Sequence, residues 1–109
     1  MDAESEHRIG RNEAVARQVN EAIESGKAPA DVHAPIAFRC ECGELGCNQL
    51  FEVTLGDYER VRAHSRHFLV ADGHEQLEVE SVVQRCFGYT VVEKLDVAGR
   101  VADASDPRS

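Results

Sequence analysis

Residues 36–54 have the sequence IAFRCECGELGCNQLFEVT, and this stretch decides how the chain folds. Ile36, Phe38 and Cys40 alternate along its first part, which is the period of a strand with one buried face. Its last part, residues 50–54, has the aromatic and β-branched composition of a second strand. Cys40 ends the first part, and Cys42 and Cys47 lie between the two parts. We therefore expect two antiparallel strands joined by a cysteine loop.

The cysteine loop has the spacing C-x-C-x4-C and contains Cys40, Cys42 and Cys47. Residues two apart in a strand share a face, so the first two thiols can converge on one ion. Gly43 and Gly46 allow the positive φ angles that bring the third thiol near them. A sulfur-rich tetrahedral site selects Zn²⁺ or iron over Mg²⁺ or Ca²⁺. The loop therefore predicts a metal site, with Zn²⁺ as the expected ion.

Three thiolates leave one coordination position open. We favour His74, because it follows an expected strand in a glycine-containing turn that fixes its backbone. Glu75 beside it is a candidate hydrogen-bond partner outside the ligand set. Cys86 is the next candidate, and it would complete a four-sulfur site. The other possible ligands are Glu44, His33, His64 and His67.

The cysteines also allow a redox disulfide or a set of inert, buried thiols. Glu41, Glu44 and the two glycines make the loop polar, so we expect it to be exposed, which suits a metal site better than a core. Three thiolates donate so much charge that zinc becomes a poor Lewis acid, and few aromatic residues are present to build a deep pocket. We therefore expect a closed structural Cys3His site and no enzymatic activity.

Outside the loop, periodicity and turn residues predict a helix over 6–25, a linker over 26–35, a helix over 55–64, strands over 67–70, 77–86 and 89–95, and a flexible tail over 98–109. Thr54 and Asp57 match a capping box at the second helix. The fold class is α+β: an N-terminal helix and a small, mostly antiparallel sheet with a zinc-knuckle-like loop and one short helix. The chain is thus expected to divide into an N-terminal tail and helix over 1–25, the linker over 26–35, a zinc-stapled domain over 36–97 and the C-terminal tail over 98–109.

Two groups of residues are candidates for binding a partner. The first is the apolar seam of the N-terminal helix, which includes Val19 and Ile23. This helix either packs on the domain or binds a partner. The second group is the basic cluster with Arg60, Arg62 and Arg66, which either binds an anionic ligand or is simply a solvated face.

The chain has 109 residues and a formal net charge of −8, with 42% hydrophobic residues. Residues 7–95 alone carry fourteen acidic and ten basic residues. Such a surface binds nucleic acid and anionic lipid poorly, so we expect neither partner. We find no signal peptide pattern after Met1 and expect a cytoplasmic protein, in which thiols stay reduced.

Several blocks carry a family resemblance: FRCECG at 38–43 with the third cysteine, VTLGDYERVR at 53–62, RHFLV at 66–70, GHE at 73–75, GY at 88–89, VVEK at 91–94, and RNEA through VNE over 11–21. Over about residues 8–95 the chain resembles a family of small uncharacterised actinobacterial proteins. The resemblance implies a shared pattern of Cys40, Cys42, Cys47 and His74, without Cys86. Asp72 stands where the family has Pro, which changes the rigidity of the turn but leaves the His74 assignment unchanged.

These observations predict a zinc-binding protein-interaction module of regulatory function, with a protein partner and an oligomeric state that the sequence leaves open. The alternative is a thiol redox sensor that releases zinc on oxidation. A nucleic-acid-binding zinc module is a weaker third hypothesis, because the charge opposes it.

Overall fold

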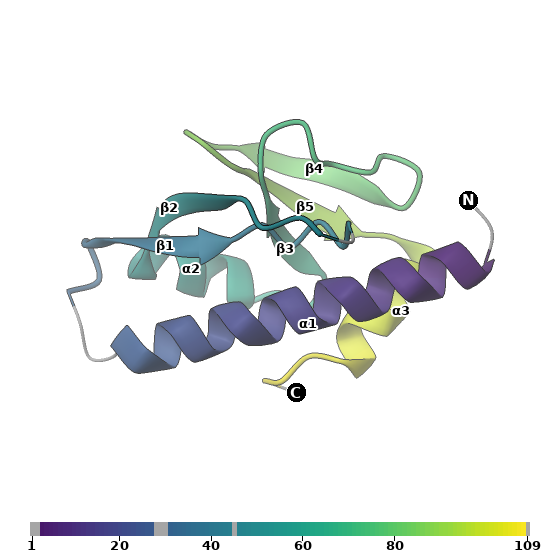
Figure 1. Ribbon diagram of the computed structural model, residues 1–109, viewed down its shortest axis with the longest axis horizontal. Helices are drawn as coiled ribbons and strands as arrows, with labels where there is room; N and C mark the ends of the chain where they lie inside the picture. Colours follow the sequence, from purple (N-terminus) through teal and green to yellow (C-terminus); the bar gives the residue numbers. More distant parts are fainter. Residues whose placement is uncertain (1–2, 28–30, 45, 109) are drawn as a thin grey trace.

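The computed structural model describes residues 3–27, 31–44 and 46–108. The elements run in the order α1 (Ala3–Lys27), β1 (Pro35–Arg39), β2 (Leu50–Thr54), α2 (Leu55–Arg62), β3 (His67–Val70), β4 (Glu80–Arg85), β5 (Thr90–Lys94) and α3 (Asp96–Ala104). This arrangement confirms the α+β class (Figure 1). Residues 28–30 of the expected linker lie outside the described residues. No helix in the described ranges is long and apolar enough to cross a membrane.

The strands form two antiparallel sheets, where the sequence predicted one. In the first, β1 pairs with β2, so that Phe38 lies opposite Phe51. In the second, β5 lies between β3 and β4. The β4–β5 pairing confirms the expected hairpin, and its register shifts between Val82 and Gln84. The capping prediction for α2 is confirmed at Thr54, whose hydroxyl accepts a hydrogen bond from the Asp57 amide at 3.1 Å.

Helix α1 lies along the length of the molecule, beneath the strands and against α3 (Figure 1). Of the two possibilities for this helix, the structure therefore shows the packed one. Gly10 lies where α1 meets α3: a Cβ atom at this position would come within 2.9 Å of Val101 Cγ1. Glycine lowers helix propensity here but allows the two helices to approach closely.

The face that α1 buries is largely polar, which differs from the apolar seam that the sequence predicted. Glu13, Arg17 and Asn20 are almost fully buried on it, whereas Val19 is 37% exposed. Each of the buried polar side chains has a partner on another element: Asn20, for example, donates to the Arg39 carbonyl and accepts from the Arg39 amide, both at 2.8 Å. Burial of polar groups on this face is tolerated because the groups are hydrogen-bonded.

The prediction of a flexible tail over 98–109 was wrong, because residues 96–104 form α3. Ala102 and Gly99 are buried, and Asp103 holds the helix to Arg66 by an ion pair of 2.9 Å. The segment after α3 is also anchored, since Asp106 pairs with the buried Arg62. The sequence offers no start signal for this helix, because Leu95 at its N-cap makes no side-chain capping bond and Gly99 lowers helix propensity.

Two groups of buried side chains form the core. The first lies between the β1–β2 sheet, α2 and β5, and contains a stacked pair, Phe38 and Tyr58, with ring centroids 4.3 Å apart. The second lies between the cysteine loop, β3, β5 and α3, and includes Phe68. Because Cys40 and Cys42 belong to the second group, the cysteine loop starts inside the core.

Candidate metal centre

The cysteine loop connects β1 to β2 and is closed by backbone hydrogen bonds. The Cys40 amide donates to the Gln49 carbonyl at 2.9 Å, and the Cys47 amide donates to the Glu44 carbonyl at 3.1 Å. Gly43 has φ +78° and Gly46 has φ +83°. Both values lie in the left-handed region, where a residue with a side chain would have a strained backbone. The two glycines thus permit the turn that returns Cys47 to the other cysteines.

The structure brings all four predicted ligands together. The candidate ligand atoms of Cys40, Cys42, Cys47 and His74 all lie within 4.8 Å of one another. His74 Nδ1 is 3.5 Å from Cys40 Sγ and 3.7 Å from Cys47 Sγ. A sulfur and a nitrogen bound to one tetrahedral zinc ion lie about 3.5 Å apart, given bonds of about 2.3 and 2.0 Å. The four side chains could therefore hold a metal ion without a large rearrangement.

His74 reaches the loop from the turn after β3. Its amide donates to the Ala71 carbonyl at 2.9 Å, and Gly73 between them has φ +85°. Glu75 forms an ion pair with Arg85 at 3.0 Å. The ion pair uses Oε1 of Glu75, and among the described residues this carboxylate forms no hydrogen bond with His74, the partner that the sequence offered.

Cys86 lies apart from this group. It precedes the turn of the β4–β5 hairpin, where its amide donates to the Tyr89 carbonyl at 2.9 Å. Its side chain packs against the first core group rather than against the cysteine loop. The fourth member of the cluster is therefore His74, as the sequence predicted, and Cys86 is a packing residue.

The loop is more buried than its polar sequence suggests. Cys40 and Cys42 are 2% and 1% exposed, and Glu41 between them is fully buried, whereas Glu44 is exposed. The expectation of an exposed loop is thus wrong for its first half. The first half is buried because the Glu41 side chain finds hydrogen-bond partners inside the protein. Its carboxylate accepts hydrogen bonds from the Leu69 amide at 2.9 Å and from Asn20 at 2.8 Å, and these bonds offset the cost of burying a polar group.

Burial still raises the pKa of Glu41, against the effect of these hydrogen bonds. The carboxylate thus ties the loop to β3 on one side and to α1 on the other. The sequence indicated Glu41 only as a polar loop residue. Strand alternation indicates that its side chain points away from those of the two cysteines, and that face is buried because Asn20 of α1 packs against it.

Hydrogen bonds also reach the cysteines themselves. The Ala71 amide donates to Cys40 Sγ at 3.1 Å, and Arg39 Nη2 donates to the Cys47 carbonyl at 3.2 Å. Gln76 bridges the Cys42 carbonyl and the Glu44 carboxylate. Contacts of this kind orient ligands around an ion and tune their affinity.

The thiols interact electrostatically. A hydrogen bond with Cys40 lowers the pKa of Cys42, and the same bond, together with burial, raises the pKa of Cys40. The two neighbouring thiols therefore do not both ionise readily by themselves. A divalent cation bound between them would stabilise both thiolates, since metal binding releases the protons of its ligands.

The predicted basic cluster is divided by the structure. Arg60 is exposed and pairs with Asp57 on its own helix. Because α2 ends at Arg62, Arg66 lies beyond the helix and does not share a face with Arg62. Of the two candidates on α1, Val19 is partly exposed and Ile23 packs against the first core group.

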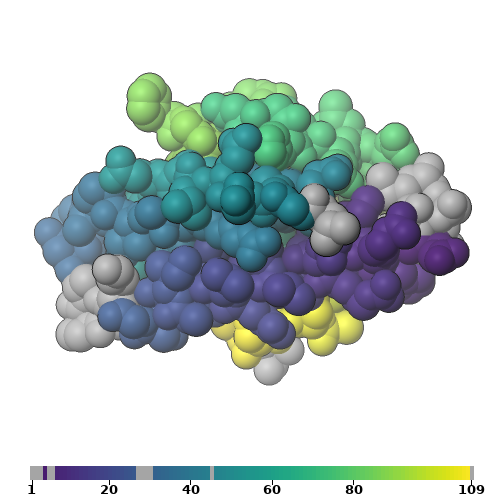
Figure 2. Space-filling view, viewed as in Figure 1, coloured from purple at the N-terminus to yellow at the C-terminus, as the bar shows by residue number. Residues whose placement is uncertain are grey.

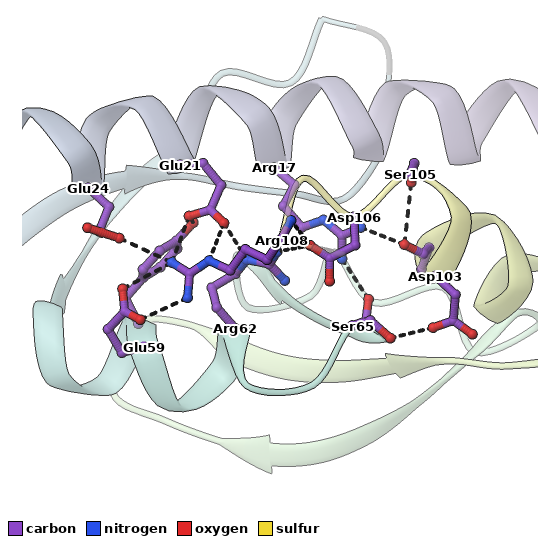
Figure 3. Close-up of polar contacts among 12 residues, drawn as sticks. Arg17, Glu21, Glu24, Glu59, Arg62, Ser65, Asp103, Ser105, Asp106 and Arg108 are labelled. Carbon is purple, nitrogen blue, oxygen red and sulfur yellow. Dashed lines mark hydrogen bonds and ion pairs between the residues drawn. The ribbon is translucent and has the colours of Figure 1, made fainter.

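Arg62 is fully buried, so it cannot offer its charge to a ligand at the surface. Its guanidinium group pairs with Glu21 on α1 at 3.2 Å and with Asp106 after α3 (Figure 3). Next to it, Arg108 pairs with Glu21 and Glu59. These contacts join α1, α2 and the C-terminal segment by charge, which apolar periodicity does not detect.

A second buried cluster lies deeper. Lys94 on β5 pairs with Glu13 on α1 and with Glu80 on β4, and all three are almost fully buried. Arg17 and Lys94 both lie over the Phe68 ring. Burial raises the pKa of Glu13 to about 7, although Lys94 opposes the shift. Lys94 shares its strand face with the buried Val92, which is a sequence signal for the burial of Lys94 but not for its partners.

Comparison of the chain with protein families, with curated proteins and with solved structures found no match. The resemblance to the actinobacterial family therefore stays a prediction.

Proposed function

We propose that the protein binds one Zn²⁺ ion through Cys40, Cys42, Cys47 and His74, and that this ion stabilises a small interaction module. The observation that carries the proposal is the spacing of the ligand atoms: the two sulfur–nitrogen distances, 3.5 and 3.7 Å, are those of ligands on one tetrahedral ion. The soft sulfur donors favour zinc or iron over harder ions.

A structural role for the ion fits the position of the site. The loop starts in the core, and its ligands come from both sides of that core, three after β1 and one after β3. An ion there crosslinks two segments 34 residues apart, from Cys40 to His74. Four protein ligands complete a tetrahedral shell, which is typical of structural zinc sites.

Cobalt substitution tests this proposal. We expect the reduced protein to bind one Co²⁺ with the intense visible bands of a tetrahedral, thiolate-rich site, and Zn²⁺ to displace it. The Cys47→Ala variant should lose these bands, and Cys86→Ala, a cysteine outside the cluster, should retain them. Absence of Co²⁺ and Zn²⁺ binding by the reduced wild type would contradict the proposal.

The interaction role is supported by exposed apolar side chains on the opposite part of the molecule. Phe87 is fully exposed at the tip of the β4–β5 hairpin, and Val83 is 48% exposed nearby. Both line a hollow of about 560 Å³ between this hairpin, β2 and α2. A Phe87→Ser variant that keeps its fold and its zinc but loses a copurifying protein would support a protein partner at this hollow. Retention of that protein would exclude Phe87 as a contact.

Redox sensing is a second candidate, favoured by one observation. Cys40 and Cys47 line a hollow of about 200 Å³ between α1 and the loop, which gives small oxidants a route to the sulfurs. Oxidation of two thiolates to a disulfide by hydrogen peroxide, which is reduced to water, would release the ion. Stoichiometric zinc release at low peroxide would support this role, and retention of zinc would exclude it.

A further inference from the structure

One turn of α1 approaches the cysteine loop closely at Gly43, where a side chain would not fit. A Cβ atom on Gly43 would lie 2.7 Å from Glu13 Cγ, 2.8 Å from Ile9 Cγ2 and 2.9 Å from the Ile9 carbonyl oxygen. In addition, Asn12 Nδ2 donates a hydrogen bond to the Gly43 carbonyl at 3.0 Å. Residues 9–13, which we call the covering turn, therefore contact the loop directly beside Cys42. Figure 2 shows the loop region lying against α1.

The covering turn is held from its other side by the buried charge cluster. Glu13 contacts Gly43 through its Cγ atom and pairs with Lys94 through its carboxylate. The same side chain thus lies between the loop and the centre of the protein. The covering turn therefore cannot move away without disturbing both the loop and the charge cluster.

Asn20, farther along α1, also contacts the loop, because its amide group donates to the Glu41 carboxylate at 2.8 Å. Glu21, about two turns from the covering turn, pairs instead with Arg62 and Arg108. The contacts of Glu21 therefore hold α1 without involving the loop, and the part of the helix from Glu21 onward is the reference for the covering turn.

We infer that ion binding in the cysteine loop and docking of the covering turn are coupled, with Ile9, Asn12 and Glu13 as positioning residues of the metal site. The inference rests on the proposed function. Coupling between two binding events is reciprocal. The docked turn raises the affinity of the loop for Zn²⁺, and the bound ion holds the turn in place. A partner that draws the turn away would release the ion.

Two glycines of the loop provide a matched test. Gly43 and Gly46 have nearly the same φ, so alanine strains the backbone similarly at both. Among the described residues, chain neighbours aside, a Cβ on Gly46 would meet no atom within 4 Å. Only Gly43→Ala pushes against the covering turn. With Zn²⁺ measured by competition against a chromophoric chelator, we expect Gly43→Ala to bind at least about tenfold more weakly than Gly46→Ala.

If Gly43→Ala fails to fold, a pair of milder substitutions on α1 tests the coupling. Asn12→Ala removes the hydrogen bond to the Gly43 carbonyl, and Gln18→Ala also replaces a side-chain amide by alanine, at an exposed position of the same helix. We expect Asn12→Ala to weaken Zn²⁺ binding by about three- to tenfold relative to Gln18→Ala, which is the range of a single net hydrogen bond.

The effect of the bound ion on the covering turn is measured by amide hydrogen exchange of the wild type. Removal of Zn²⁺ should speed exchange in residues 9–14 by more than it does in residues 21–26. Equal Zn²⁺ affinities within the deciding pair, or equal changes in exchange along α1, would overturn the coupling while zinc binding itself stands. If the wild type binds no Zn²⁺, the proposed function fails instead, and the inference fails with it.

Discussion

The backbone amide of Ala71 donates a hydrogen bond to Cys40 Sγ at 3.1 Å. This bond joins the end of β3 to the first cysteine, and Ala71 also accepts the hydrogen bond of the His74 amide at 2.9 Å. The same residue thus orients one candidate ligand through its N–H group and another through its carbonyl group. The turn after β3 is therefore built together with the metal site.

The Ala71–Cys40 bond predicts a magnetic coupling across it. In protein loaded with cadmium-113, which binds as zinc does, the Ala71 amide proton should show scalar coupling to the metal through the sulfur. The preceding amide, that of Val70, is the control, because no hydrogen bond to a ligand sulfur involves it in the structure's described residues. Absence of the coupling at Ala71 in cadmium-loaded protein would contradict a Cys40–metal bond.

The identity of the fourth ligand predicts different outcomes for two substitutions of His74. His74→Ala should weaken Zn²⁺ binding by more than about 100-fold, since losing an outer partner alone costs about 10–100-fold. His74→Cys should retain tight binding, because a fourth thiolate can replace the imidazole in a tetrahedral site. Competition titrations with Zn²⁺ measure both. An affinity of His74→Ala equal to that of the wild type would show that His74 is not a ligand.

Two arginines of α2 predict opposite effects on stability. Arg62→Ala should lower the free energy of unfolding by about 3–5 kcal/mol, because it leaves the partly buried Glu21 and Asp106 carboxylates without their shared cation. Arg60→Ala removes an exposed side chain and should change the free energy of unfolding by about 0.5 kcal/mol or less. Urea unfolding of the zinc-loaded proteins measures both values. Similar losses for the two variants would refute the buried role of Arg62.

The raised pKa of Glu13 predicts a dependence of stability on pH. In the folded protein this pKa is about 7, against 4.5 for an unperturbed glutamate. The folded state therefore binds more protons between these pH values, and stability falls as pH rises from about 4.5 to 7. Glu80 and Lys94 face Glu13 from β4 and β5, and Glu41 acts on it from the loop.

Glu13→Gln keeps the shape of the side chain but cannot ionise. The difference in unfolding free energy between the variant and the wild type should therefore shift in favour of the variant by about 2–3 kcal/mol from pH 5 to pH 8. Measuring this difference at saturating Zn²⁺ cancels the pH dependence of the metal ligands. A difference that is constant with pH would show that Glu13 has an ordinary pKa.

The sequence predicted those parts of the protein in which apolar periodicity, turn residues and ligand chemistry agree. Residues 67–70 formed the expected strand, and the ligand cluster contains the predicted histidine. Prediction from the sequence failed where charged side chains hold the elements together. The polar face of α1 with Glu13 and Asn20, and the anchoring of α3 through Asp103, depend on partners distant in sequence. No local pattern reveals such pairs, because each residue alone resembles a solvated one.

Native mass spectrometry of the reduced, purified chain tests the central claim most directly. The wild type should carry one zinc ion per chain, lose it to a chelator and recover it when Zn²⁺ is added. The Cys42→Ala variant should carry none, whereas Cys86→Ala should carry one. A wild-type chain that remains metal-free in the presence of Zn²⁺, or that carries the same metal load as Cys42→Ala, would contradict the account.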